Sequence, residues 1–267
     1  MKTILITGST DGIGKIAATE LAKQQHRVLL HGRNPEKLAT TLSEIKSISG
    51  NTEVFAYRAD FGDLESVLKM AEQIRNEQQK LDVLINNAGI FKTNSPLNTN
   101  GLDIRFVVNY LAPYLLTREL LPLLESGSNS RLINLSSAAQ ASVSLTALTG
   151  KDQLTDQEAY AQSKLALTAW SFAMAQEYEE LTTIAVNPGS LLNTKMVQEA
   201  YGHHWSAAEK GSDLLVALAT SAEFDQSSGQ YFDNDKGDFG PAHPEAYEAE
   251  KTRELLAVTN ELIPTAE

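Results

Sequence analysis

The stretch Thr7-Gly8-Ser9-Thr10-Asp11-Gly12-Ile13-Gly14 directly follows a short apolar run that begins at Lys2. Glycines between a strand and a helix let backbone N–H groups approach a pyrophosphate closely, and the helix starting near Gly12 adds its positive N-terminus. The spacing is G-x-x-x-G-x-G, and the alternative interpretation is a purely structural turn. At the first strand-to-helix turn of an alternating chain, the motif predicts a nucleotide-binding loop.

Short apolar runs alternate with longer amphipathic stretches along the rest of the chain. The expected strands are Lys2–Thr7, Arg27–His31, Glu53–Arg58, Leu81–Asn86, Arg131–Ser136, Thr182–Asn187 and Gly229–Phe232. The expected helices are Gly12–Gln25, Pro35–Ser49, Leu64–Gln79, Gly101–Glu125, Asp156–Glu180, Ala207–Ser221 and Pro244–Glu261. This β-α-β-α order implies an α/β fold with a parallel sheet and helices on both faces.

Composition is typical of one soluble globular domain spanning residues 1–267, with 42% hydrophobic and 21% charged residues. The absence of cysteine excludes disulfides, thiolate metal sites and thiol nucleophiles. A net charge of −12 argues against nucleic acid and anionic membrane as partners. The first apolar run is too short for a signal peptide or a membrane span, so a cytoplasmic location is the default expectation.

Two long irregular stretches, residues 138–155 and 191–206, follow predicted strands. Ligands of open α/β sheets bind at the carboxyl ends of the strands, where both stretches are expected to lie. Long loops in compact domains are often functional. We therefore expect a substrate flap at 138–155 and a lid at 191–206.

The second predicted strand ends at His31-Gly32-Arg33-Asn34. This is where a dinucleotide fold contacts the adenosine ribose, and a carboxylate there would favour NAD. Arg33 instead offers a guanidinium group suited to a 2′-phosphate, which favours NADP(H) over NAD(H). Asp11 argues in the opposite direction, because its carboxylate would repel a nearby phosphate, and Arg33 could also be a solvated loop residue.

Tyr160 and Lys164 are four residues apart in a predicted helix, so they lie on one face, one turn apart. A free tyrosine is a poor acid or base near neutrality, and a nearby ammonium favours the phenolate. The spacing alone is weak evidence, because such pairs arise by chance in many helices.

Taken together, the motifs resemble those of the short-chain dehydrogenase/reductase family in its single-domain form. The residues that carry the resemblance, in chain order, are Thr7-Gly8-x-x-x-Gly12-x-Gly14, Asn86-Asn87-Ala88-Gly89, Asn109, Ser137, Tyr160-x-x-x-Lys164 and Pro188-Gly189. The resemblance extends from Thr3 to about Phe232, and details such as His31-Gly32-Arg33-Asn34 are most similar to the retinol-dehydrogenase-like and oxidoreductase-like branch. It implies a Rossmann-type, doubly wound sheet of seven strands in the order 3-2-1-4-5-6-7.

The resemblance also implies roles for the catalytic residues. Tyr160 would be the general acid in reduction and the general base in oxidation, and Lys164 would lower its pKa and bind the nicotinamide ribose. Ser137 would polarise the substrate carbonyl. Asn109 would sit at a helix irregularity and support a water-linked proton relay.

For the cofactor, the resemblance implies contacts beyond the glycine loop and Arg33. Asp60 and Phe61, after the third strand, would contact the adenine. Asn87-Ala88-Gly89 would line the cofactor, and Pro188-Gly189 and Thr194 would flank the nicotinamide carboxamide.

The implied function is NADP(H)-dependent interconversion of a small-molecule alcohol and a ketone or aldehyde. A non-catalytic NADP-binding sensor or scaffold is the alternative, and an epimerase or dehydratase would need a larger C-terminal domain. Homodimers or homotetramers are the candidate assemblies, since family members often dimerise through the helix that here contains Pro113. The segment Asp233–Asp238 resembles a calcium loop, but position twelve is Pro244 rather than Glu, so no metal site is expected.

Overall fold

The computed structural model of the chain describes residues 1–264, apart from the side chains of residues 200 and 201. Its strands are β1 (Thr3–Ile6), β2 (Arg27–Gly32), β3 (Val54–Arg58), β4 (Val83–Asn86), β5 (Arg131–Leu135), β6 (Thr182–Asn187), β7 (Gln230–Asp233) and β8 (Asp238–Gly240). Its α-helices are α1 (Gly12–Lys23), α2 (Pro35–Ser49), α3 (Leu64–Glu77), α4 (Ile104–Phe106), α5 (Ala112–Glu125), α6 (Leu145–Leu148), α7 (Asp156–Glu177), α8 (Lys195–Tyr201), α9 (Glu209–Thr220) and α10 (Ala249–Leu262).

These strands form one sheet in the order β3-β2-β1-β4-β5-β6-β7-β8. Strands β1 to β7 are parallel, which confirms the predicted order 3-2-1-4-5-6-7. The eighth strand, β8, pairs antiparallel with β7 and was not predicted. It has only three residues, too few to show an alternating pattern, and follows a turn in which Gly237 has a positive φ of 74°.

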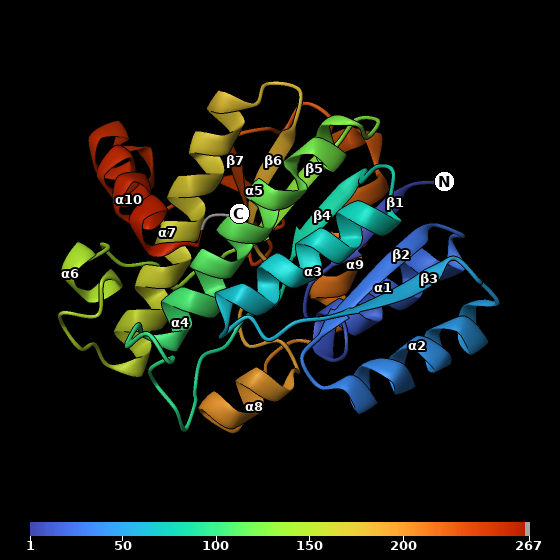
Figure 1. Cartoon of the computed structure of the whole chain (residues 1–267), viewed down its shortest axis with the longest axis horizontal. Coiled ribbons are helices and arrows are strands. Elements are labelled where there is room, and N and C mark those ends of the chain that lie inside the picture. The colour runs from blue at the N-terminus through green and yellow to red at the C-terminus, as the bar shows by residue number, and fades with distance from the viewer. Residues whose placement is uncertain (265–267) are drawn as a thin grey trace.

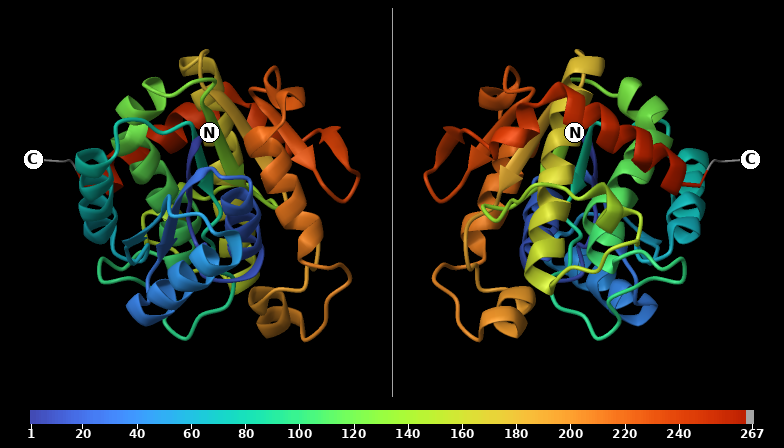
Figure 2. Two further views of the ribbon diagram at one scale, coloured as in Figure 1. Left: turned by 90° about the vertical axis from the view of Figure 1, so that its right-hand side faces the viewer. Right: turned by 90° about the vertical axis from the view of Figure 1, so that its left-hand side faces the viewer.

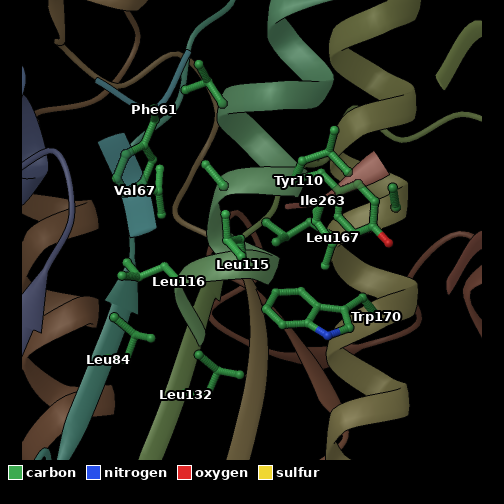
Figure 3. Packing of buried hydrophobic residues seen from close by; sticks show 14 of the residues in the cluster. Phe61, Val67, Leu84, Tyr110, Leu115, Leu116, Leu132, Leu167, Trp170 and Ile263 are labelled. Carbon is green, nitrogen blue, oxygen red and sulfur yellow. The ribbon is translucent and has the colours of Figure 1, made fainter. Parts of the chain in front are cut away.

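Helices cover both faces of the sheet (Figures 1 and 2). Ile4 and Ile6 of β1 belong to the core beneath α1, α2 and α9, whereas Leu5 belongs to the opposite core beneath α3, α5 and α7. This alternation is expected of a strand buried on both faces. Figure 3 shows the second core, in which Leu115, Leu132 and Trp170 take part.

The helix predicted over Gly101–Glu125 begins later and is interrupted. It starts at Ile104 as α4, passes through a π-helical segment, η1 (Val107–Leu111), and continues as α5. Pro113 has no N–H to donate to the carbonyl of Asn109 four residues earlier, and its ring crowds that carbonyl. The π-helical turn accommodates this, so the irregularity expected at Asn109 is present.

The C-terminal helix predicted from Pro244 is split into a 3₁₀ turn, η3 (Pro244–Tyr247), and α10. A second 3₁₀ turn, η2 (Ala222–Phe224), follows α9. Helix α10 lies beside α7 (Figure 1), and Thr259 on α10 hydrogen-bonds the hydroxyl of Tyr110 at 2.7 Å. Helix α10 therefore covers part of the helix that contains Pro113, which was expected to contact a second copy of the chain.

The flap and lid stretches are less irregular than expected. The flap contains α6 and the lid contains α8, which ends at Gly202 in the left-handed conformation. Both helices are short, and each begins with a hydroxyl cap, Ser144 and Thr194 respectively. Among residues 1–264, no helix combines the length and apolarity needed to cross a membrane.

Candidate active site

The glycine loop packs closely against the end of β4. Gly8 has a positive φ of 66°, and a Cβ there would lie 2.8 Å from the Cα of Ala88. A Cβ on Gly14 would lie 2.4 Å from Nδ2 of Asn87, which donates to the carbonyl of Thr7 at 2.7 Å. Side chains at these two glycines would force the loop away from Asn87 and Ala88. The loop can therefore present its backbone, including the first-turn N–H groups of α1, to an anion.

Asp11 is the N-cap of α1, and its carboxylate accepts a hydrogen bond from the N–H of Gly12 at 2.8 Å. Lys37 of α2 lies 2.5 Å from the same carboxylate and donates a hydrogen bond that holds the pKa of Asp11 below its usual value. The charge of Asp11 is thus partnered by an ammonium, which reduces the repulsion that the sequence suggested for a phosphate.

His31 links this loop to the adenosine side of the predicted site. Its Nδ1 accepts a hydrogen bond from the N–H of Gly8 at 3.0 Å, so Nε2 carries the proton that faces the carbonyl of Ala59 at 3.1 Å. Its ring stacks on Phe61 with 4.2 Å between centroids. Burial lowers the pKa of His31 to about 4, which keeps the ring neutral at physiological pH.

The side chains of Ser9 and Phe61 are buried, and the expected part of these two residues in cofactor binding stays a prediction. Ser9 is completely buried, and its hydroxyl accepts from the N–H of His31 at 2.9 Å. Phe61 is buried under His31. Both support the loop from behind. His31 was not among the predicted site residues, and its only signal was its place immediately before Gly32 and Arg33.

The adenosine edge carries two arginines. Arg33 is exposed just beyond β2, and Arg58, at the end of β3, donates from Nε to the carbonyl of Arg33 at 3.2 Å. Asp60 follows β3 on the same edge and accepts from the N–H of Gly62 at 2.9 Å. Arg58 thus lies against the backbone of Arg33, at the edge where the ribose phosphate is predicted to bind, and Arg58 was not anticipated.

Tyr160 and Lys164 both lie on α7, whose start is fixed by a capping box between Thr155 and Glu158. The Nζ atom of Lys164 lies 5.6 Å from the centre of the Tyr160 ring. It donates to the carbonyl of Leu135 at 2.7 Å. Burial lowers the pKa of Lys164 to about 8. The ammonium is thus fixed beside the phenol, and Tyr160 itself is half-buried with its ring edge-on to Phe91.

Asn109 holds the chain that follows β4. Its Oδ1 accepts from the N–H of Ile90 at 2.8 Å, and its Nδ2 donates to the carbonyl of Ile90 and to Oγ of Ser163, both at 3.0 Å. A Cβ on Gly89 would lie 3.3 Å from Oδ1 of Asn109 and 3.5 Å from Nζ of Lys164. The structure thus brings Asn109, Gly89 and Lys164 together.

The two serines after β5 have different surroundings. Ser136 is buried, with its hydroxyl 2.6 Å from that of Thr168. Ser137 is half-buried, and its Oγ accepts from the N–H of Ala139 at 3.1 Å. A hydroxyl that accepts such a bond still has its own hydrogen to donate. This distinction agrees with the choice of Ser137 as the catalytic serine.

The loop after β6 returns over the phosphate loop. Thr194 caps α8, and its methyl carbon lies 3.5 Å from the position of a Cβ on Gly12. Asn234 donates to the carbonyl of Pro188 at 2.8 Å, and Asp235 accepts from the N–H of Ser190 at 2.8 Å. The β7–β8 turn thus holds the Pro188-Gly189 segment, a contact the sequence did not reveal. Among the described residues, no group of three His, Cys, Asp or Glu side chains is placed to hold a metal.

The amino-acid sequence matches a known family. The profile of the short chain dehydrogenase family matches residues 2–204 of the chain. The chain is a short-chain dehydrogenase/reductase. This membership confirms the family expected from the order of the motifs.

Curated relatives of this dehydrogenase include retinol dehydrogenase 13 of Homo sapiens, which is 32% identical over 98% of the chain and 84% of the relative. A Streptomyces sp. (strain C5) protein described as a daunorubicin C-13 ketoreductase is 33% identical over 86% of the chain and 82% of its own length. A protein described as a short chain dehydrogenase from Escherichia coli CFT073, complexed with NADPH, superimposes with a TM-score of 0.73. It is 28% identical over 87% of this chain and 96% of its own.

Proposed function

We propose that this short-chain dehydrogenase/reductase interconverts an alcohol and a ketone or aldehyde with NADP(H) as the hydride carrier. The observation that carries the proposal is the convergence of three groups at the carboxyl end of β5. Tyr160 lies beside the buried ammonium of Lys164, that ammonium is bonded to Leu135 of β5, and Ser137 follows Leu135 by two residues.

The residues have distinct tasks in carbonyl reduction. A nicotinamide cofactor, when bound, would supply the hydride for the carbonyl carbon. Ser137 donates its hydroxyl hydrogen to the carbonyl oxygen, where negative charge develops. Tyr160 delivers the proton to that oxygen, a form of catalysis typically worth about 10²–10⁴-fold. Lys164 stabilises the resulting phenolate, and in alcohol oxidation the same groups act in reverse.

Asn109 keeps this arrangement in place and offers a route for proton resupply. Its side chain is engaged with Ile90 and Ser163, so it fixes the wall beside Lys164. Its backbone carbonyl cannot receive the usual helical hydrogen bond from residue 113, because that residue is proline. This carbonyl is therefore suited to hold a relay water.

The residues at the adenosine edge fit a phosphorylated ribose. Arg33 and Arg58 provide two planar guanidinium groups, and guanidinium groups bind phosphate through paired hydrogen bonds. Lys37 compensates the nearby carboxylate of Asp11. The complexes of similar Escherichia coli and Shigella flexneri proteins with NADPH and NADP are in line with this preference.

For the substrate we propose a moderately hydrophobic alcohol or carbonyl compound. Trp205, in the stretch expected to form a lid, is 73% exposed, and Leu97, in the loop between β4 and α4, is 43% exposed. Relatives named retinol dehydrogenases and a ketoreductase support an apolar substrate class.

The test follows NADPH at 340 nm with a panel of apolar aldehydes and ketones, together with NADH as the comparison. We expect turnover with at least one apolar carbonyl, and faster with NADPH. Tight NADPH binding without turnover on any carbonyl or alcohol would instead indicate a non-catalytic sensor.

A further inference from the structure

The carbonyl oxygen of Ser137 accepts hydrogen bonds from two side chains. Gln140 donates from Nε2 at 2.9 Å, and Tyr231 of β7 donates from its hydroxyl at 3.0 Å. Burial raises the pKa of Tyr231, so its hydroxyl remains a donor over the whole physiological range. Ser137 lies just beyond β5, where the sheet no longer fixes its backbone. These two bonds therefore define the orientation of its peptide group.

Gln140 is held at both ends of its amide. Its Oε1 accepts from the N–H of His243 at 3.2 Å, while its Nε2 faces Ser137. Because one partner is a backbone donor and the other a backbone acceptor, only one orientation of the amide satisfies both. Gln140 thus connects the catalytic serine to the segment that precedes η3, which lies beyond the residues matched by the family profile.

We propose that Gln140 is a positioning residue for Ser137, which places the serine hydroxyl for the carbonyl oxygen of the substrate with support from Tyr231 and His243. The inference rests on the proposed function, because it assigns Gln140 a part in the same reaction. The hydroxyl oxygen of Ser137 already accepts from the N–H of Ala139, so one of its two lone pairs is occupied, and a fixed peptide plane at Ser137 further restricts the directions left to its hydrogen.

Loss of a residue that only anchors the flap would have a different effect on activity. The chain offers such an anchoring residue for comparison. Ser142 lies on the same flap and donates to Glu245 at 2.6 Å, so it joins the flap to the same C-terminal segment. Within residues 1–264, its hydroxyl hydrogen-bonds Glu245 and not Ser137. If Gln140 acted only by anchoring the flap, loss of either tether would have a similar effect.

The experiment compares Gln140→Ala, Gln140→Glu and the control Ser142→Ala in the full-length chain. Gln140→Glu retains an acceptor for His243 but has no hydrogen to donate to Ser137 when ionised. We expect both Gln140 variants to lower kcat about 10-fold, since small misplacements of reacting groups cost factors of this order. The KM for NADPH and the melting temperature should stay near wild type, and Ser142→Ala should lower kcat much less than either Gln140 variant.

A double-mutant cycle with Ser137→Ala decides whether Gln140 acts through the serine. Single-turnover oxidation of bound NADPH, with enzyme in excess, gives the rates of slow variants. In the Ser137→Ala background, Gln140→Ala should cause no further loss. An equal loss in both backgrounds, or a Gln140→Ala enzyme as active as Ser142→Ala, would overturn the proposal. If the wild-type enzyme is active and either of these results is found, the proposal for Gln140 fails while the proposed function stands. If the wild-type enzyme is inactive, both the proposal and the proposed function fail.

Discussion

Lys164 donates a hydrogen bond from Nζ to the carbonyl oxygen of Leu135 at a distance of 2.7 Å. Leu135 is the last residue of β5, and Ser137 follows two positions later. This contact joins the helix that carries Tyr160 to the strand that leads to Ser137. It also keeps an ammonium inside the protein, where burial lowers the pKa of Lys164 to about 8.

The buried ammonium should make stability depend on pH. The pKa of Lys164 is depressed in the folded chain, so between about pH 8 and 10.5 the unfolded chain binds a proton that the folded chain does not. The free energy of unfolding therefore rises with pH across this window because of Lys164. Below pH 8 the folded chain carries the full cost of a buried charge.

Lys164→Met removes this dependence. We expect the variant to gain stability relative to wild type when urea unfolding is measured at pH 7, and to lose most of that relative gain at pH 9.5. The substitution also leaves the carbonyl of Leu135 without the hydrogen bond from Lys164. This loss lowers the free energy of unfolding equally at both pH values, so it cancels when the two are compared. Exposed Lys151→Met is the control and should show no such difference. An identical effect of Lys164→Met at the two pH values would contradict a depressed pKa.

Arg33→Asp should change the cofactor preference. The new carboxylate would repel a 2′-phosphate and accept from a free ribose hydroxyl, so the ratio of kcat/KM for NADPH to that for NADH should fall at least about 10-fold. Arg253→Asp makes the same charge change on exposed α10 and should leave the ratio unchanged. A ratio that responds equally to both substitutions would show a general electrostatic effect rather than a phosphate contact.

Asp235→Ala should loosen the segment after β6. Asp235 accepts from the N–H of Ser190 at 2.8 Å and from Nδ2 of Asn187 at 2.9 Å. Hydrogen bonds to charged groups are worth about 1.5–3 kcal/mol when buried, and less here because Asp235 is exposed. We expect a severalfold rise in the KM for both substrate and cofactor. Asp238→Ala at the start of β8 is the control, and equal effects of the two substitutions would remove Asp235 from this role.

Local patterns in the sequence predicted most of the fold. Strands such as Val83–Asn86 are nearly all apolar, and glycine or capping residues mark the helix starts, so the order of β1 to β7 was accessible. The short β8 was not, since it depends on pairing rather than on periodicity, and the irregularity at Val107–Leu111 was expected only from the family resemblance.

The site was predictable where a motif has fixed spacing, as with Tyr160 and Lys164. It was not predictable where residues from distant parts of the chain meet. Tyr231 reaches Ser137 from 94 positions away, and Gln140, which is close to Ser137 in sequence, meets the distant His243 at the other end of its amide. His31 likewise gains its place only when β2 lies beside the glycine loop.

The most direct test of the account is the Tyr160→Phe enzyme, with NADPH oxidation followed at 340 nm in the presence of an accepted carbonyl substrate and NADPH binding measured by fluorescence. Phenylalanine keeps the ring that packs against Phe91 and removes only the hydroxyl. The account predicts loss of turnover by at least about 10²-fold with nearly unchanged NADPH affinity. Turnover close to wild type, with NADPH bound normally, would contradict the assignment of Tyr160 as the general acid.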